Sequence, residues 1–154
     1  MNKREIIDEV VPYDGKCMVC ETDLEGNITY VNRCFVKMTG FEKDEILSNG
    51  FELIRHPDVP QCLFTKMWEA LKEKEDWKGY LKILTKEGKY FWTTIYITPT
   101  TDDAGKLTGY SAAYTEAEDL MVENMSRLYA EAIASESCPD ELSSDIAIAN
   151  LAAH

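Results

Sequence analysis

The sequence lacks any long apolar run. Its longest apolar stretches fall well short of the roughly 18 residues that a membrane span requires. Its charged start, with Lys3, Arg4 and Glu5, leads into no signal-peptide core. These absences predict a cytoplasmic protein with no direct membrane insertion.

Positive charge is also scarce. The chain holds 16 Lys and Arg residues against 28 Asp and Glu residues, so its formal net charge is −12. A field of that sign repels phosphate backbones and anionic lipid head groups. We therefore expect neither a nucleic-acid partner nor a role at a membrane surface.

The cysteines follow no recognised pattern. They are odd in number and lack the spacing of a disulfide framework or a zinc finger. Cys17 and Cys20 have the C-x-x-C spacing, but no second pair follows and no histidine comes directly after them. We interpret this pair as two small residues on a strand.

Motifs of catalysis are absent as well. The sequence has no phosphate-cradling glycine-rich loop, no Gly-x-Ser-x-Gly elbow, no metal-binding histidine pair and no kinase signature. The adjacent acids Asp102 and Asp103 are interpreted as turn residues. The protein is therefore not expected to be an enzyme.

The length and hydrophobic content of the sequence predict a single folded domain. With 154 residues, of which 45% are hydrophobic, the chain is long enough to bury one core of ordinary size. Near its start, Ile6, Ile7 and Val10 stand at helical spacing. They predict a short helix over residues 3–10, which residues 12–15 end.

Two β-favouring runs follow this segment. They cover residues 16–22 and 27–31, and the turn-rich residues 23–26 join them as a hairpin. From residue 32 to residue 50 the pattern changes to short helical pieces joined by glycines. Such pieces favour a cupped wall.

A longer amphipathic helix is predicted after Pro60. Apolar residues hold i, i+4 spacing there for about three turns, and they are Cys62, Leu63, Met67, Trp68, Ala70 and Leu71. Three strand-like runs come next, over residues 77–85, 90–98 and 107–114.

The predicted order is therefore β-β-α-α-α-β-β-β. Two hairpin-connected blocks that flank a helical middle imply an α+β fold, with a five-stranded antiparallel sheet and helices packed on one face. Such a cup commonly holds a ligand. We place an N-terminal helical cap at residues 1–15, the sheet domain at residues 16–115, and a C-terminal helix and tail at residues 116–154.

The C-terminal helix is predicted over residues 117–135. Its apolar residues stand at near-heptad spacing, and they are Leu120, Met121, Met125, Leu128, Ala132 and Ile133. The helix either packs on its own sheet or makes a dimer or partner contact, and its length does not decide between the two. Beyond Pro139 the chain forms one more short helix or stays disordered.

Several motifs occur in an order and spacing that resemble a known family. They are Ile28-Thr29-Tyr30-Val31-Asn32, Thr39-Gly40-Phe41, Arg55-His56-Pro57-Asp58-Val59-Pro60, Trp77-Lys78-Gly79 and Tyr90-Phe91-Trp92. Over roughly residues 16–115 the chain resembles the PAS domain of bacterial aerotaxis receptors. The Arg-His-Pro-Asp-x-Pro run is the most distinctive of these motifs and points to that subgroup.

The resemblance implies a PAS sensor fold that holds a non-covalent FAD, whose redox state reports oxygen or energy status. Carried over by residue, it implies cofactor contacts from Arg55, His56 and Asp58, with Asn32 and Trp77 as further site residues. Physically, a planar guanidinium suits a diphosphate. A flavin ring also needs an apolar or aromatic slot with a few donors at its edge.

Other interpretations of these residues stay open. The chain has Ile83 within a stretch where the family has Asn-Arg, which removes a polar contact from the expected pocket wall. His56 also allows a heme bound through one imidazole. The run from Arg55 to Asp58 equally suits a structural corner, and the whole module suits a ligand-free interaction or dimerisation domain.

The resemblance also implies a partner. No output domain is recognisable in the sequence. If these residues are the full protein, the signal is expected to pass to a separate protein; the chain equally suits a domain of a longer receptor or histidine kinase. By resemblance, a separate partner is expected to be a membrane-bound, methyl-accepting chemotaxis transducer, with another signalling protein as the alternative. A homodimer is expected as well.

Overall fold

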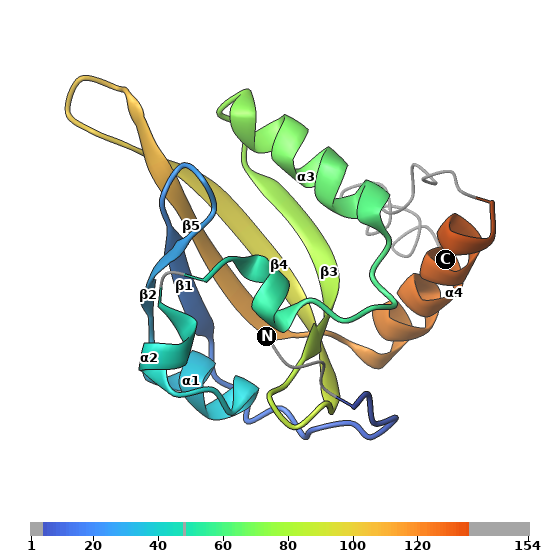
Figure 1. Cartoon of the computed structure of the whole chain (residues 1–154). Helices are drawn as coiled ribbons and strands as arrows, with labels where there is room; N and C mark the ends of the chain where they lie inside the picture. Colours follow the sequence, from blue (N-terminus) through green and yellow to red (C-terminus); the bar gives the residue numbers. More distant parts are fainter. Residues whose placement is uncertain (1–4, 48, 136–154) are drawn as a thin grey trace.

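The computed structural model describes residues 5–47 and 49–135 (Figure 1). Its elements run in the order β1 (Met18–Thr22), β2 (Ile28–Val31), α1 (Arg33–Thr39), α2 (Lys43–Ile46), the 3-10 helix η1 (Phe51–Ile54), α3 (Gln61–Lys72), β3 (Trp77–Leu84), β4 (Tyr90–Thr101), β5 (Leu107–Glu116) and α4 (Asp119–Ser135). The predicted order of strands and helices is confirmed.

The five strands form one antiparallel sheet in the order β2-β1-β5-β4-β3. The first and last strands in sequence, β1 and β5, therefore lie side by side at its centre. Met18 and Ile95 both pair with Tyr114. Because directly paired residues point to the same face of a sheet, these three side chains form one row on the inner face.

The helices α1, α2, η1 and α3 cover this inner face, and the core lies between the two layers (Figure 1). The predicted stripe of α3 is confirmed, since Leu63, Met67 and Leu71 are fully buried. From α1, the ring of Phe35 meets the ring of Tyr114 edge-on, with centroids 5.9 Å apart.

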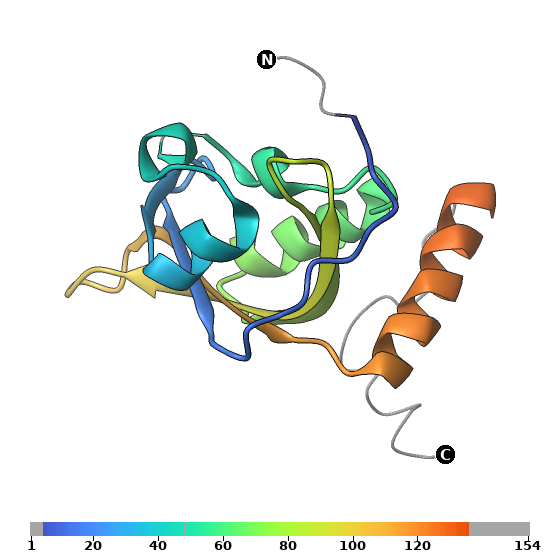
Figure 2. The ribbon, with the colours of Figure 1, turned by 90° about the horizontal axis from the view of Figure 1, so that it is seen from below.

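The last helix, α4, lies on the other side of β3 from α1 (Figure 2). The hydroxyl of Tyr129 donates to the carbonyl oxygen of Tyr80 at 2.6 Å, and its ring lies 5.1 Å from that of Trp92. Most of the near-heptad positions are buried, whereas Leu120 and Ile133 are exposed. The helix thus packs on its own sheet, and its use in a homodimer stays a prediction.

The helix predicted over residues 3–10 is wrong for its described part. Residues 5–10 form no helix: the amide of Ile7 donates to the carbonyl oxygen of Gly88, that of Val11 donates to the carbonyl oxygen of Tyr90, and Val10 forms a parallel bridge with Tyr90. The β4 hairpin offers free backbone partners to a segment rich in β-branched residues, and this outweighs the helical spacing. Residues 1–4, and the short helix expected as one alternative after Pro139, lie outside the described residues.

Two further observations concern the described ranges. Within them, no helix is long and apolar enough to cross a membrane, and no group of His, Cys, Asp and Glu side chains is arranged to hold a metal ion. Cys20 lies buried in β1 and Cys17 lies exposed just before it, and both are free thiols.

Candidate functional site

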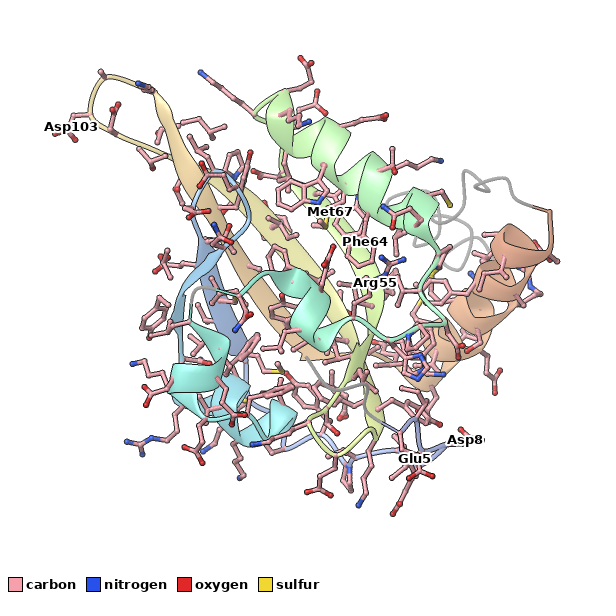
Figure 3. All side chains as sticks on the ribbon, viewed as in Figure 1. Glu5, Asp8, Arg55, Phe64, Met67 and Asp103 are labelled. Atoms are coloured by element: carbon pink, nitrogen blue, oxygen red, sulfur yellow. The ribbon has the colours of Figure 1, made fainter. Side chains whose placement is uncertain are left out.

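Arg55 is held where the helical layer meets the edge strand β3. It follows η1 and forms an isolated antiparallel bridge with Ile83. Its guanidinium donates to Gln61 Oε1 at 2.9 Å and to the carbonyl oxygen of Val59 at 3.2 Å. The guanidinium also lies 4.8 Å from the ring centroid of Phe64, and Figure 3 shows the two side chains next to each other.

His56 is a buried, neutral corner residue. Its Nδ1 accepts the amide hydrogen of Asp58 at 3.0 Å, so the neutral ring carries its proton on Nε2. The ring meets Tyr90 edge-on, with centroids 6.1 Å apart. Burial lowers the pKa of His56, the charge of Lys82 lowers it further, and Asp58 opposes both effects in part.

Asp58 faces α4 rather than Arg55. Its Oδ2 lies 2.8 Å from Lys82 Nζ, and this hydrogen bond is the main reason that the pKa of Asp58 lies below its usual value. The pair lines a cleft of about 380 Å³ between the sheet and α4, together with Trp92 and Tyr129.

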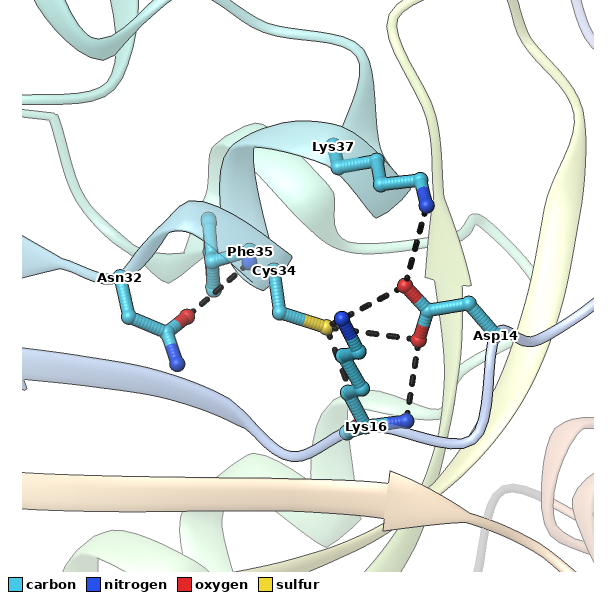
Figure 4. Close-up of polar contacts among 6 residues, drawn as sticks. All are labelled: Asp14, Lys16, Asn32, Cys34, Phe35 and Lys37. Carbon is cyan, nitrogen blue, oxygen red and sulfur yellow. Dashed lines mark hydrogen bonds and ion pairs between the residues drawn. The ribbon is translucent and has the colours of Figure 1, made fainter.

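Asn32 ties α1 to β1 through backbone hydrogen bonds. Its Oδ1 accepts the amide hydrogens of Phe35 and Val19, each at 3.0 Å, and its Nδ2 donates to the carbonyl oxygen of Cys17 at 3.0 Å. Figure 4 shows the side chain at the start of α1. An asparagine in this position is a preferred N-cap.

The indole ring of Trp77 lies over Gly79 of the same strand, β3. The residue is 7% exposed, and a Cβ at position 79 would lie 2.1 Å from the Trp77 ring. The glycine at position 79 therefore makes room for the indole. In this way the Trp-x-Gly spacing has a packing explanation.

The five residues expected from the sequence do not share one cavity. Among the five main cavities of the described ranges, Arg55 lines two and Asp58 lines another, whereas Asn32, His56 and Trp77 line none. Their contacts with a cofactor stay predictions.

A residue that the sequence reasoning missed, Tyr114, lines a small cavity inside the domain. The cavity measures about 10 Å³, which is room for about one water. Tyr114 is fully buried, and its hydroxyl has no hydrogen-bond partner in the described part of the chain. Burial raises its pKa well above the usual value, so the hydroxyl stays protonated. An orphaned buried donor of this kind is costly unless a partner is supplied.

A larger cleft lies directly outside this internal cavity. It measures about 380 Å³, within the range of small-molecule sites, and is lined by Glu25, Gly26, Asn27, Gly50, Phe51, Glu52, Arg55, Gln61, Phe64 and Trp68. Phe51, Arg55 and Phe64 line the internal cavity too. The internal cavity and the cleft therefore share these three residues in their walls.

The order of the strands and helices can now be compared with known protein families. Residues 28–114 match the family described as PAS fold, which is more than half of the chain. The protein belongs to the PAS fold family.

Among known proteins, the chain is similar to the aerotaxis receptor of Escherichia coli, with 33% identity over 116 residues, which are 75% of this chain and 23% of the receptor. It is 31% identical to the nitrogen fixation regulatory protein of Klebsiella pneumoniae over 91 residues, 59% of this chain and 18% of that protein. The chain thus spans less than a quarter of the length of these relatives.

Solved structures agree on the fold. The light-state LOV domain of the blue-light photoreceptor Aureochrome1 has a TM-score of 0.63 at 19% identity, over 76% of this chain and 91% of that one. The photo-excited blue-light photoreceptor Vivid has a TM-score of 0.57 at 22% identity, over 75% of this chain and 88% of that one. At these identities the likeness concerns the fold alone.

Proposed function

We propose that this chain is a PAS sensor module that holds a flavin between its sheet and its helical layer and reports the redox state of that flavin to a signalling partner. The observation that carries the proposal is the buried, unpartnered hydroxyl of Tyr114, a residue that lines an internal cavity whose wall residues Phe51, Arg55 and Phe64 also line a cleft of ligand size. FAD is the form of flavin that the resemblance to aerotaxis receptors implies.

The residues around the internal cavity suit a flavin ring. Leu81 and Ile83 supply apolar surface from β3, and Phe51 and Phe64 supply aromatic surface from the helical side. Tyr114 supplies a donor for a polar atom at the ring edge. Because the cavity itself has room for about one water, we expect the side chains that it shares with the cleft to move when a ring enters.

A bound flavin supplies reversible electron transfer, and the protein must sense the resulting change of charge at the ring edge. Tyr114 is placed to do so, since a hydrogen bond from its hydroxyl strengthens as its acceptor becomes negative. Its carbonyl oxygen also accepts from the hydroxyl of Tyr13 at 3.0 Å, and the chain continues from Tyr114 into α4. A shift of Tyr114 therefore biases both the N-terminal segment and α4.

The names of the relatives support a role in signalling. One is named a receptor and another a regulatory protein, so we propose that the module serves in signal transduction and not in catalysis. By resemblance, the recipient is a membrane-bound methyl-accepting transducer, and the module works in the cytoplasm as a homodimer.

A heme is the weaker alternative. A heme ligand has to reach a ligand cavity, yet His56 lines none of the five main cavities of the described ranges and its Nδ1 is already an acceptor. A ligand-free interaction module is a second candidate. Such a module needs no ligand cavity, and the internal cavity has room for only about one water.

The test is an absorption spectrum of the protein purified without added cofactor, followed by denaturation and chromatography of any released molecule. We expect flavin bands and a released flavin. A Soret band would replace the flavin with heme. A colourless protein that takes up neither added flavin nor added heme would leave the ligand-free module.

A further inference from the structure

The outer cleft carries few positive charges for a site expected to hold phosphates. Among its lining residues, Arg55 is the single cation, whereas Glu25 and Glu52 each add a carboxylate. A neighbouring hollow of about 460 Å³ along α3 shares Glu25 and adds Glu69 and Lys72. Taken together, the two hollows hold one more carboxylate than they hold cations.

The guanidinium of Arg55 is also committed already. It donates to Gln61 Oε1 and to the Val59 carbonyl oxygen, and it stacks on Phe64. A phosphate that recruits this guanidinium must compete with these contacts. Arg55, which is the one cation that lines both the internal cavity and the outer cleft, therefore has few free donors left to balance a dianionic tail.

The remaining polar groups of the outer cleft suit an uncharged ligand tail better than a phosphate. Carboxylates accept hydrogen bonds from hydroxyl groups, and amides such as that of Asn27 both donate and accept. An uncharged polyol chain meets such groups without any like-charge repulsion. This is the chemistry of a ribityl side chain that ends in a hydroxyl group.

We infer that Glu25 and Glu52 select the ligand by the charge of its outward-facing tail and favour an uncharged, hydroxyl-bearing tail over a phosphorylated one. The inference rests on the proposed flavin site and names the flavin that the site takes. Riboflavin is therefore expected to bind more tightly than either FMN or FAD, because both of these carry negative charge on the tail. FAD, which the resemblance implies, then binds more weakly than riboflavin.

The size of the effect follows from the exposure of both carboxylates. Interactions of exposed charges are worth about 0.2–1 kcal/mol each, which corresponds to about 1.4- to 5-fold in a dissociation constant. Replacement of either carboxylate by its amide should therefore tighten FAD binding by up to about fivefold. Riboflavin binding should stay unchanged.

The experiment titrates the protein with riboflavin, FMN and FAD and follows flavin fluorescence at about 0.01 M and about 1 M salt. The variants are Glu25→Gln and Glu52→Gln, and Glu73→Gln is the control because it removes the same charge outside both hollows. We expect salt and the two cleft variants to tighten FAD binding and to leave riboflavin binding unaltered, and the control to change neither.

Two outcomes overturn the inference in distinguishable ways. If FAD binds more tightly than riboflavin and salt weakens it, phosphates are attracted to the outer cleft; the selection by charge is then wrong, while the flavin site stands. If none of the three flavins binds at any salt concentration, the inference and the proposed function fall together.

Discussion

Tyr114 and Arg55 line the same internal cavity, the tyrosine from the central strand β5 and the arginine from the segment that follows η1. Tyr114 has a buried hydroxyl without a partner in the described residues, and Arg55 lines both the cavity and the outer cleft. The unpartnered hydroxyl and the side chain shared by the cavity and the cleft therefore come from opposite layers of the fold.

The first prediction uses the contrast between two buried tyrosines. Tyr114→Phe should stabilise the ligand-free protein by about 1 kcal/mol, because it removes an orphaned hydroxyl without leaving a new unpaired group. Tyr129→Phe is the matched control: it removes a hydroxyl that donates to the Tyr80 carbonyl oxygen and should destabilise by a similar amount. Thermal unfolding measures both, and destabilisation by Tyr114→Phe would show that its hydroxyl has a partner.

The second prediction concerns Asn32, whose side chain forms hydrogen bonds with three backbone groups. Asn32→Ala should cost about 2–3 kcal/mol in the free energy of unfolding without any ligand, because it removes a helix cap and leaves backbone donors unpaired. As a control, Asn124→Ala, which removes one surface contact to Arg127 on α4, should cost less than about 0.5 kcal/mol. A variant that keeps full stability but loses flavin binding would instead make Asn32 a cofactor ligand.

The third prediction separates packing from ligand binding at Trp77. Gly79→Ala should destabilise the protein by about 1–3 kcal/mol, since the new methyl group meets the indole ring. In a Trp77→Leu background the same substitution should cost much less, and the double-mutant cycle measures this coupling. Equal costs in both backgrounds would mean that the indole does not depend on the glycine.

The fourth prediction is a pH dependence that arises from His56. Its pKa in the folded protein lies below the unfolded value of 6.5, so the unfolded chain binds more protons at mildly acidic pH. The stabilisation is complete above that value and is lost as the pH falls through it. Tm should therefore drop between about pH 7.5 and about pH 5.5.

His56→Asn is the control for this step, because the asparagine Oδ1 still accepts the Asp58 amide hydrogen but does not titrate. The pKa values of Asp58, Asp14 and Glu45 are lowered in the folded protein. Protonation of these carboxyl groups therefore lowers Tm only at a pH more acidic than the His56 step. An unchanged drop in the variant would assign the pH step to another group.

The fold was predictable because its signals are local. Leu63, Met67 and Leu71 repeat with the helical period, and the runs of β5 alternate as strands do. The error over residues 3–10 has a tertiary cause, since Ile7 and Val11 find backbone partners in the distant β4 hairpin. Spacing within the segment carries no information about such partners.

The site was less predictable than the fold. Alternation in β5 places Tyr110, Ala112 and Tyr114 on one face, but only the packed structure shows which hydroxyl lacks a partner. The resemblance likewise places Arg55 and Asp58 at one cofactor site. The backbone turns at Pro57, and the two side chains face different cavities.

The central claim is that the Tyr114 hydroxyl lies in a flavin site, and one titration tests it most directly. Riboflavin is added to the wild type, to Tyr114→Phe and to Tyr30→Phe, whose tyrosine is exposed on β2, and flavin fluorescence is followed. We predict saturable one-to-one binding that Tyr114→Phe weakens by about three- to tenfold, the loss expected for one hydrogen bond, and that Tyr30→Phe leaves unchanged. Absence of saturable binding, or equal affinity in all three proteins, would contradict the account.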